Sequence, residues 1–231
     1  MASPSLMPVA HDRQPLTESV YTQLADAICA GVLAPGEALV QERLAESLGV
    51  SRQPILQALA MLRRDGFVEP ADKRGYRVSR LSPDMVADVY SLRGALDRLA
   101  AGAAARRVKA GAVTPAMLAQ LDAALDQGEA ALGRGDTALL IEADQAFHQA
   151  IYDLSGNQLI GESAAQPWRH IRRAMGAVLQ NNTGRRGVWQ EHRRIVTAIQ
   201  KGDGEGAERE ASAHADQAAA RMGAGADPVP A

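Results

Sequence analysis

ERLAESLGVSRQPILQAL, residues 42–59, has the pattern of two short helices joined by a tight turn. Apolar residues at helical spacing mark the first helix, and Gly49 stands where helices commonly end. Ser51 is a good N-cap for the second helix, so only a short turn separates the two segments. The stretch therefore predicts a compact helical hairpin.

The second helix of this hairpin has an inward and an outward face. Its inward stripe at helical spacing is Ile55, Ala58, Leu59 and Leu62. That spacing leaves Ser51, Arg52, Gln53 and Leu56 near the exposed start of the helix. A helix-turn-helix directs these positions toward base edges in the major groove of DNA. Similar hairpins also occur in proteins that bind no nucleic acid.

The flanking segments extend the hairpin into a larger motif. A helix is predicted from Leu16 to Ala30, followed by a turn at Pro35-Gly36 between two short extended pieces. After the hairpin, residues 66–70 and 76–79 alternate like two strands around the polar tip ADKRG, which carries Lys73, Arg74 and Gly75. Helix, helical hairpin and β-hairpin in this order predict a winged helix-turn-helix domain over residues 15–80.

The distribution of charge supports this interpretation. The whole chain has a formal net charge of −2, which argues against a general polyanion-coating protein. Residues 43–80 nevertheless hold eight basic and four acidic side chains, so positive charge is concentrated where phosphates would lie. A solvated charged face is the alternative explanation of the same residues.

Composition limits the class of protein further. The chain has 231 residues, enough for one or two domains, and its 3% aromatic content with many Ala and Leu predicts a mainly α protein. Cys29 is the single cysteine, so no intrachain disulfide is possible, and a small core residue is its simplest role. No segment resembles a signal peptide or a membrane span. We expect a soluble cytoplasmic protein with disordered ends at residues 1–14 and 224–231.

A second, all-helical domain is predicted over residues 81–223. Ser82 and Pro83 form a helix start at its boundary. The predicted helices are Val86–Val108, Thr114 to near Gly133, Asp136 to Ser155, Leu159–Leu179 with a bend near Pro167, Val188–Gln200 and Glu205–Met222.

Four ionisable residues of this domain point toward apolar packing. Asp144 and His148 lie one helical turn apart, and His192 and His214 fall within the apolar stripes of two later helices. A lone inward histidine is usually a core residue with one hydrogen-bond partner. Four inward groups on three helices are better explained by a shared divalent metal ion, zinc first, with nickel and manganese as alternatives. His170, beside several arginines, is assigned to the surface.

Arg93 is the other residue of interest in this domain. Tyr90, Leu96 and Leu99 flank its face of the predicted helix, so its side chain is a candidate to line the same interior. A guanidinium there would hold a carboxylate ligand through two hydrogen bonds. An ion pair with Asp88 or Asp97 explains the same spacing.

From Leu16 to Met222 the residues resemble GntR-type transcription regulators of the FadR-like branch with an FCD effector domain. The pattern LxExLGVSRxPxxxAL, followed by DGxV and RGxxV, is similar to that family's winged helix. The pattern DxxFH…H…H, filled by Asp144, His148, His192 and His214, is similar to its metal-binding set.

The resemblance implies a DNA-binding domain and an antiparallel helical bundle that dimerises and binds a small organic acid near the metal. It implies that the DNA contacts come from Arg43, Ser51, Arg52, Gln53 and the wing tip with Arg74 and Gly75. It also implies that Arg93 and Asn157 contact the effector. One departure is clear, because Leu56 and Gln57 stand where the family usually has arginine and glutamate.

These observations predict a homodimeric, metabolite-responsive transcription regulator that binds double-stranded operator DNA, and a repressor before an activator. Two alternatives remain. A metal-dependent enzyme would need a base such as Glu191, but adjacent helical positions face different directions, which places Glu191 poorly. A DNA-binding protein with a purely structural metal site is the other.

Overall fold

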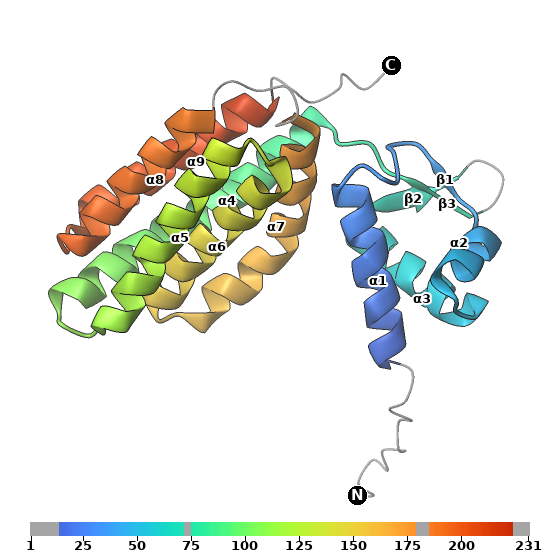
Figure 1. The fold of residues 1–231 in the computed structure, drawn as a ribbon, viewed down its shortest axis with the longest axis horizontal. Helices are drawn as coiled ribbons and strands as arrows, with labels where there is room; N and C mark the ends of the chain where they lie inside the picture. Colours follow the sequence, from blue (N-terminus) through green and yellow to red (C-terminus); the bar gives the residue numbers. More distant parts are fainter. Residues whose placement is uncertain (1–13, 72–74, 179–184, 224–231) are drawn as a thin grey trace, which may run out of the picture. The chain divides into compact units, whose positions relative to one another are not determined.

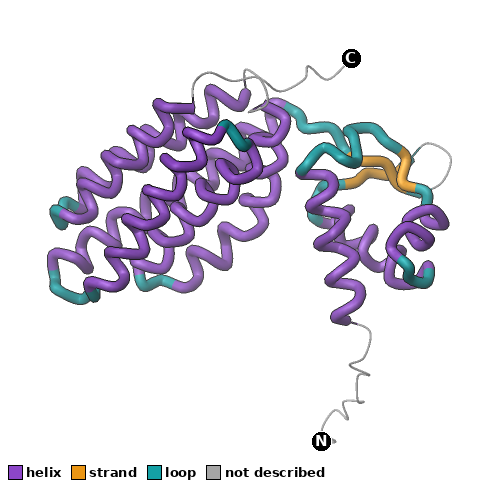
Figure 2. Tube along the Cα trace, viewed as in Figure 1, coloured by secondary structure: helices purple, strands orange, loops and turns teal. Residues whose placement is uncertain are grey.

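The structure is a computed structural model that describes residues 14–71, 75–178 and 185–223. The predicted disordered tail at 224–231, nearly all of that at 1–14, and Arg74 lie outside these ranges. The described chain divides into two compact units: the first holds residues 14–28 and 32–80, and the second holds residues 29–31 and the described residues from Leu81 onward. Helices occur in both units, whereas the described strands all belong to the first (Figures 1 and 2).

The first unit contains the helical hairpin. Helix α1 spans Gln14–Cys29, α2 spans Gln41–Leu48 and α3 spans Arg52–Arg64. Gly49 adopts a left-handed φ of 63° and ends α2, which is the conformation that glycine adopts most readily. Ser51 is extended at the start of α3 but makes no side-chain capping bond, so the predicted cap position holds while the predicted hydrogen bond does not.

A small antiparallel sheet completes this unit. Its strands are β1 (Ala38–Leu39), β2 (Val68–Pro70) and β3 (Tyr76–Val78), in the order β1-β3-β2. The predicted hairpin is β2 and β3, with Glu69 opposite Arg77. Only the second of the two extended pieces predicted around Pro35-Gly36 is a strand, and it pairs with β3, with Leu39 opposite Tyr76. Leu59, Leu62 and Phe67 lie in the core below, fully buried.

The second unit is an antiparallel bundle of the described helices α4 (Pro83–Lys109), α5 (Pro115–Arg134), α6 (Thr137–Ser155), α7 (Gln158–Val178), α8 (Arg185–Gln200) and α9 (Gly204–Gly223). Three of its helices begin where the sequence predicts, at Ser82, Thr114 and Asp136. The side chains of Ser82, Thr114 and Asp136 each accept backbone N–H groups of the first turn of α4, α5 and α6. Helix α7 is continuous across Pro167.

Helix α4 packs most extensively on α9 and also contacts α6, α7 and α8, so its inner face meets most of the bundle (Figure 1). Small residues allow this, since Ala100, Ala101, Ala104 and Ala105 are all fully buried. In the described part of the chain, no helix is both long and apolar enough to cross a membrane.

Candidate metal centre and DNA-binding surface

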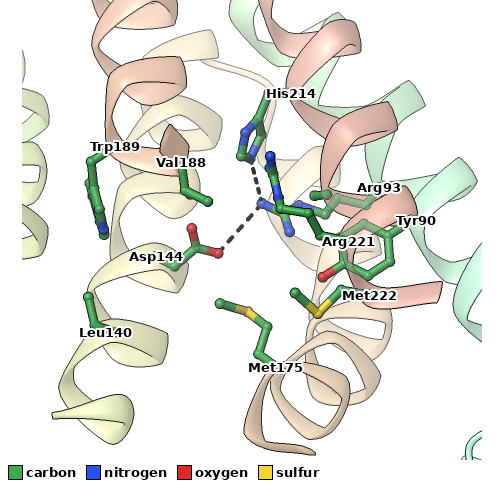
Figure 3. A pocket seen from close by; sticks show the side chains of 11 residues that line it. Tyr90, Arg93, Leu140, Asp144, Met175, Val188, Trp189, His214, Arg221 and Met222 are labelled. Carbon is green, nitrogen blue, oxygen red and sulfur yellow. Dashed lines mark hydrogen bonds and ion pairs between the residues drawn. The ribbon is translucent and has the colours of Figure 1, made fainter. Parts of the chain in front are cut away.

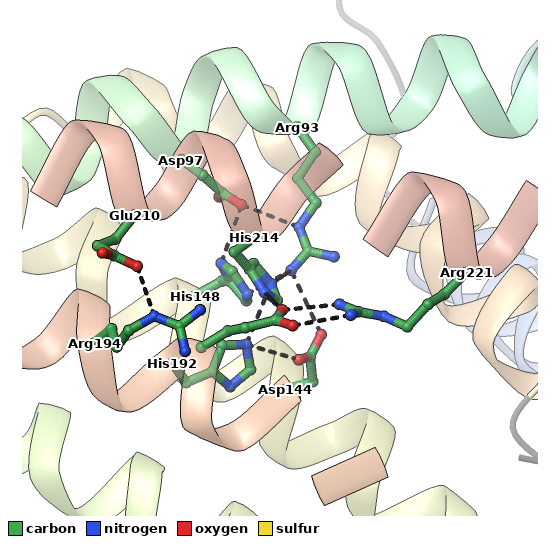
Figure 4. A network of polar contacts seen from close by, with 10 residues as sticks. Arg93, Asp97, Asp144, His148, His192, Arg194, Glu210, His214 and Arg221 are labelled. Atoms are coloured by element: carbon green, nitrogen blue, oxygen red, sulfur yellow. Dashed lines mark hydrogen bonds and ion pairs between the residues drawn. The ribbon is translucent and has the colours of Figure 1, made fainter. Parts of the chain in front are cut away.

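Four helices of the bundle direct polar side chains into one buried cluster (Figure 4). Arg93 comes from α4, Asp144 and His148 from α6, His192 from α8 and His214 from α9, and each is at most 3% exposed. The structure thus brings together all four predicted metal ligands and Arg93. Buried ionisable groups are costly unless they are paired, so the contacts among them decide what the cluster is for.

The three histidines form the centre of the cluster. One ligand atom from each of His148, His192 and His214 lies within 4.8 Å of the other two. The Nε2 atoms of His192 and His214 are 3.3 Å apart. The fourth predicted ligand, Asp144, places its Oδ1 atom 3.4 Å from His192 Nε2.

Two further carboxylates contact the Nδ1 atoms of two of the imidazole rings. Asp97 Oδ2 lies 3.3 Å from His148 Nδ1, and Glu191 Oε2 lies 2.8 Å from His214 Nδ1. When Nδ1 carries the proton it donates to the carboxylate, which leaves the Nε2 lone pair directed toward the centre. This carboxylate–imidazole arrangement is the one that metal-binding histidines commonly have.

Glu191 has a role that the sequence did not indicate, since it was considered there only as a catalytic base beside His192. It contacts His214 on α9, and it is buried. Arg221 donates two hydrogen bonds to its carboxylate, at 2.9 and 2.8 Å. No pattern along α8 alone identifies this role, because the partners come from another helix. His170, assigned to the surface from the sequence, is also buried.

Arg93 makes the ion pair that its sequence position predicts, and its side chain also lies in the interior of the bundle. Its Nε atom lies 3.1 Å from Asp97 Oδ2, which is the predicted i,i+4 ion pair. Its other end contacts His148 Nε2 and lies 3.6 Å from Asp144 Oδ2. The expected flanking was partly wrong, because Tyr90 is buried with Arg93 whereas Leu99 is 49% exposed.

Burial and charge together shift the pKa values of these groups. Burial lowers the pKa of His192 well below its ordinary value, and the neighbouring His214 and His148 add to that shift. Burial also lowers the pKa of His214, against the opposing effect of Glu191. For Asp97, burial alone would raise the pKa, but His148 and Arg93 outweigh it and the net pKa is lowered. Burial thus favours the neutral imidazoles of His192 and His214, which is the protonation state in which histidine ligates metals.

The residues present fit a divalent cation. Among the described residues, His192 Nδ1 is a buried atom without a hydrogen-bond partner, and its Nε2 faces the two other histidines. Three imidazoles and one carboxylate are a nitrogen and oxygen donor set that suits zinc, nickel or manganese. Asp144, His148, His192 and His214 are the residues that would hold the ion.

A cavity of about 50 Å3 opens beside the cluster (Figure 3), with room for a few water molecules. Arg93, Asp144, His214 and Arg221 form its polar side. Its remaining lining is mostly apolar and aromatic: Tyr90, Leu140, Met175, Val188, Trp189, Ala218 and Met222. Burial raises the pKa of Tyr90 to about 12, so its hydroxyl stays protonated at neutral pH. The polar side of the cavity thus holds two guanidinium groups beside the carboxylate of Asp144.

Asn157 lies apart from this cavity. It follows Gly156 in the turn between α6 and α7, and its side-chain Oδ1 accepts the backbone N–H of Leu159 at 3.2 Å. It lines a different hollow together with Arg107, Gln149 and Glu162. The structure therefore does not bring together the two residues that the resemblance implies for the effector.

In the first unit, the predicted DNA-binding residues are exposed. Ser51, Arg52 and Gln53 lie together at the start of α3, and Arg43 lies on α2. The Arg52 guanidinium lies 2.6 Å from Glu42 Oε1 in an exposed ion pair. At the β-hairpin, Gly75 has a φ of 89°, a conformation that favours glycine. Its neighbour Arg74 is outside the described residues.

Comparisons with known proteins agree with this architecture. Residues 16–78 match the family of bacterial regulatory proteins named gntR, and residues 88–217 match the FCD domain. An HTH-type transcriptional regulator from an unstable DNA locus of Streptomyces ambofaciens is 34% identical over 190 residues, which cover 80% of this chain and 75% of that protein. The HTH-type transcriptional repressor RspR of Escherichia coli is 27% identical over 201 residues, 87% of this chain and 86% of RspR.

A solved structure shares the fold. Escherichia coli McbR/YncC superposes with a TM-score of 0.75 at 24% sequence identity, covering 90% of this chain and 96% of that one. The winged helix-turn-helix matches one family model, and the helical domain matches a second model over more than half of the chain. Together these matches identify the family. The chain belongs to the GntR family of bacterial regulatory proteins, carries an FCD domain, and is a transcription regulator rather than an enzyme.

Proposed function

We propose that this regulator is a repressor that senses a small organic acid through a metal-containing helical domain. The observation that supports it best is the buried cluster of three histidines and Asp144 with Arg93 beside it, next to a cavity. That RspR is named a repressor favours this direction of control. The winged domain would bind operator DNA, and the helical domain would modulate that binding.

Zinc is the first choice for the metal, with nickel and manganese as alternatives, because the donor set is nitrogen and oxygen without thiolate. A bound divalent cation supplies a positive site to which a carboxylate oxygen can coordinate. Metal analysis of the purified protein tests this step. One ion per chain in the unaltered protein, and its loss in His192→Ala, is the expected result, whereas equal metal content in both would contradict it.

A carboxylate is the proposed effector because of the groups at the cavity. Arg93 would donate to it, and Arg221, which is paired with Glu191, also lines the cavity. The cavity volume of about 50 Å3 restricts the ligand to a small acid. A thermal-shift panel of small carboxylates, each matched with its uncharged carboxamide, tests the idea. Stabilisation by an acid but not by its amide supports it, and no stabilisation by any acid would favour a purely structural metal site.

A second copy of the chain is the proposed partner of α4. Helix α4 carries a stripe of apolar residues at alternating spacings of four and three residues, which is the pattern of a helix–helix seam. The stripe consists of Met85, Val89, Leu92, Leu96, Leu99 and Ala103. Leu92 is 50% exposed and Leu99 is 49% exposed. Asp84 and Asp88 lie beside the start of this stripe, and Arg106 and Lys109 beside its end. An antiparallel pair of α4 helices would therefore match both shape and charge.

Sedimentation equilibrium tests the dimer. The unaltered chain is expected to be a dimer and Leu92→Glu with Leu99→Glu a folded monomer, because the substitutions place charge in the seam. Leu159→Glu is the matched control, since Leu159 is equally an exposed leucine but lies on α7, and this variant should remain dimeric. A dimer that survives the double substitution would exclude the α4 seam.

Binding to DNA from upstream of the protein's own gene tests the regulatory role. A labelled fragment should bind with an affinity that falls steeply as salt rises, since phosphate contacts release counterions. A dimer that inserts one α3 helix into each of two major-groove half-sites should prefer a pseudo-palindrome. Absence of salt-sensitive binding to any such fragment, with or without metal, would refute the proposal.

A further inference from the structure

The exposed face of α3 has an apolar centre. Helical spacing places Arg52, Leu56 and Arg63 along one line of this face, with Ala60 one turn after Leu56. Leu56 is 42% exposed, while the opposite face of the helix, at Ile55, Leu59 and Leu62, is fully buried. Leu56 is therefore not required by the core of the domain, and its side chain projects from the surface that a helix-turn-helix presents to DNA.

The polar groups next to Leu56 are engaged elsewhere. Thr17 Oγ1 donates to Gln57 Oε1 at 2.8 Å, which holds that amide toward α1. Arg52 is paired with Glu42 on α2. The middle of the face thus offers hydrocarbon from Leu56 and Ala60, with Gln53 and the arginines at its borders.

We propose that Leu56 is a specificity-determining residue that contacts the C5 methyl group of a thymine in each half-site. The inference rests on the proposed entry of α3 into the major groove. Thymine is the only standard base with a methyl group there. Over any other base edge, a leucine would desolvate donors and acceptors without replacing their hydrogen bonds, which disfavours those bases.

The experiment removes that methyl group alone. A preferred site is first selected from random duplex DNA by the full-length protein, and each thymine of both half-sites is then replaced by uracil, one symmetric pair at a time. Uracil retains base pairing and the O4 acceptor and lacks only the methyl. At one symmetric pair of positions we expect the affinity to fall about fourfold for each methyl group removed, the value of one buried methylene-sized group.

Variants connect the effect to Leu56. Leu56→Ala should bind the thymine and uracil sites with nearly equal affinity at that pair. Leu56→Arg should shift the preference there toward guanine, whose O6 and N7 accept two hydrogen bonds. Leu159→Ala, an exposed leucine of the other unit, should reproduce the unaltered profile. Because Leu56 is exposed, these variants are expected to fold.

The possible results distinguish failure of the Leu56 proposal from failure of the proposed DNA-binding function. No preferred sequence and no salt-sensitive binding would overturn the proposed function, and the inference with it. Sequence-specific binding that is indifferent to uracil at every thymine would overturn the inference alone. A uracil effect that persists unchanged in Leu56→Ala would also overturn it, because the methyl group would then be recognised by another residue.

Discussion

His192 is the residue whose surroundings point most directly to a metal. It is fully buried, and its Nε2 faces Asp144 and His214 rather than a dedicated hydrogen-bond donor. Its Nδ1 has no partner among the described residues. A buried imidazole with so few hydrogen bonds is costly, and a metal ion accepting its lone pair would offset that cost.

Glu191 is expected to contribute to metal affinity without touching the metal. It orients His214 and increases the basicity of its ring, so Glu191→Gln should weaken zinc binding about 10- to 100-fold in competition with a chelating dye. Glu210→Gln is the matched control, because Glu210 is paired with Arg194 at the surface of the same bundle. Equal affinities in the two variants would show that the Glu191 contact is only structural.

The metal-free protein should lose stability as the pH falls below about 6.5. His192 and His214 have lowered pKa values when folded, so in this range the unfolded chain binds more protons than the folded one. The free energy of unfolding should then fall by up to about 1.4 kcal/mol per histidine for each pH unit. Urea denaturation with chelator at pH 7.5 and 5.5 measures this.

The buried carboxylates contribute little to the change in stability between pH 7.5 and 5.5. Asp97 and Glu191 have lowered pKa values, so their contribution is present above the ordinary carboxyl pKa and is lost only at lower pH. His192→Gln should reduce the pH dependence between 7.5 and 5.5. Stability that is constant or increases on acidification would contradict buried neutral histidines.

The sequence predicted the inward direction of Asp144, His148, His192 and His214, because helical periodicity fixes which face a residue occupies. It could not predict that Asp97 and Glu191 hold two of these rings. Those hydrogen bonds cross between helices, and the relative rotation of helices is decided by packing of the whole bundle.

At the scale of the element, the approach of α5 to α8 depends on Gly128. A Cβ atom added there would overlap the indole of Trp189, which is packed edge-on against His192 with ring centroids 4.7 Å apart. The missing side chain on α5 therefore creates the space for a wall of the metal site.

Gly128→Ala should destabilise the protein by about 1–3 kcal/mol, the usual cost of overpacking. Gly133→Ala in the same helix is the control, because nothing lies within 4 Å of its added Cβ, and it should gain about 0.5–1 kcal/mol. Urea denaturation compares the two variants. Equal stabilities would show that the helices separate at no cost.

Three helix starts of the second unit were predictable, because Ser82, Thr114 and Asp136 each carry a local capping signal that the structure confirms. Strand β1 was predicted only as an extended piece. Its two residues contain no information about a partner, and pairing with β3 is a contact between segments far apart in the chain.

At the scale of the whole molecule, the proposed regulation links two separate units through one chain. Metal and carboxylate would bind the helical unit, and DNA would bind the winged unit. The effect of the carboxylate on DNA affinity is then a coupling free energy between two sites. Such coupling is reciprocal, which means that DNA must change the affinity for the acid by the same factor. The domain order was predictable from the two sequence patterns, whereas the size and sign of the coupling depend on the difference between two states.

The most direct measurement is the affinity of the zinc-loaded protein for its selected operator, titrated by fluorescence anisotropy with and without an acid that stabilises it. For a repressor released by its effector, the acid should weaken operator binding about 5- to 150-fold, a typical allosteric coupling. The His192→Ala variant should bind the operator and be insensitive to the acid. An operator affinity that is unchanged at saturating acid would contradict the account.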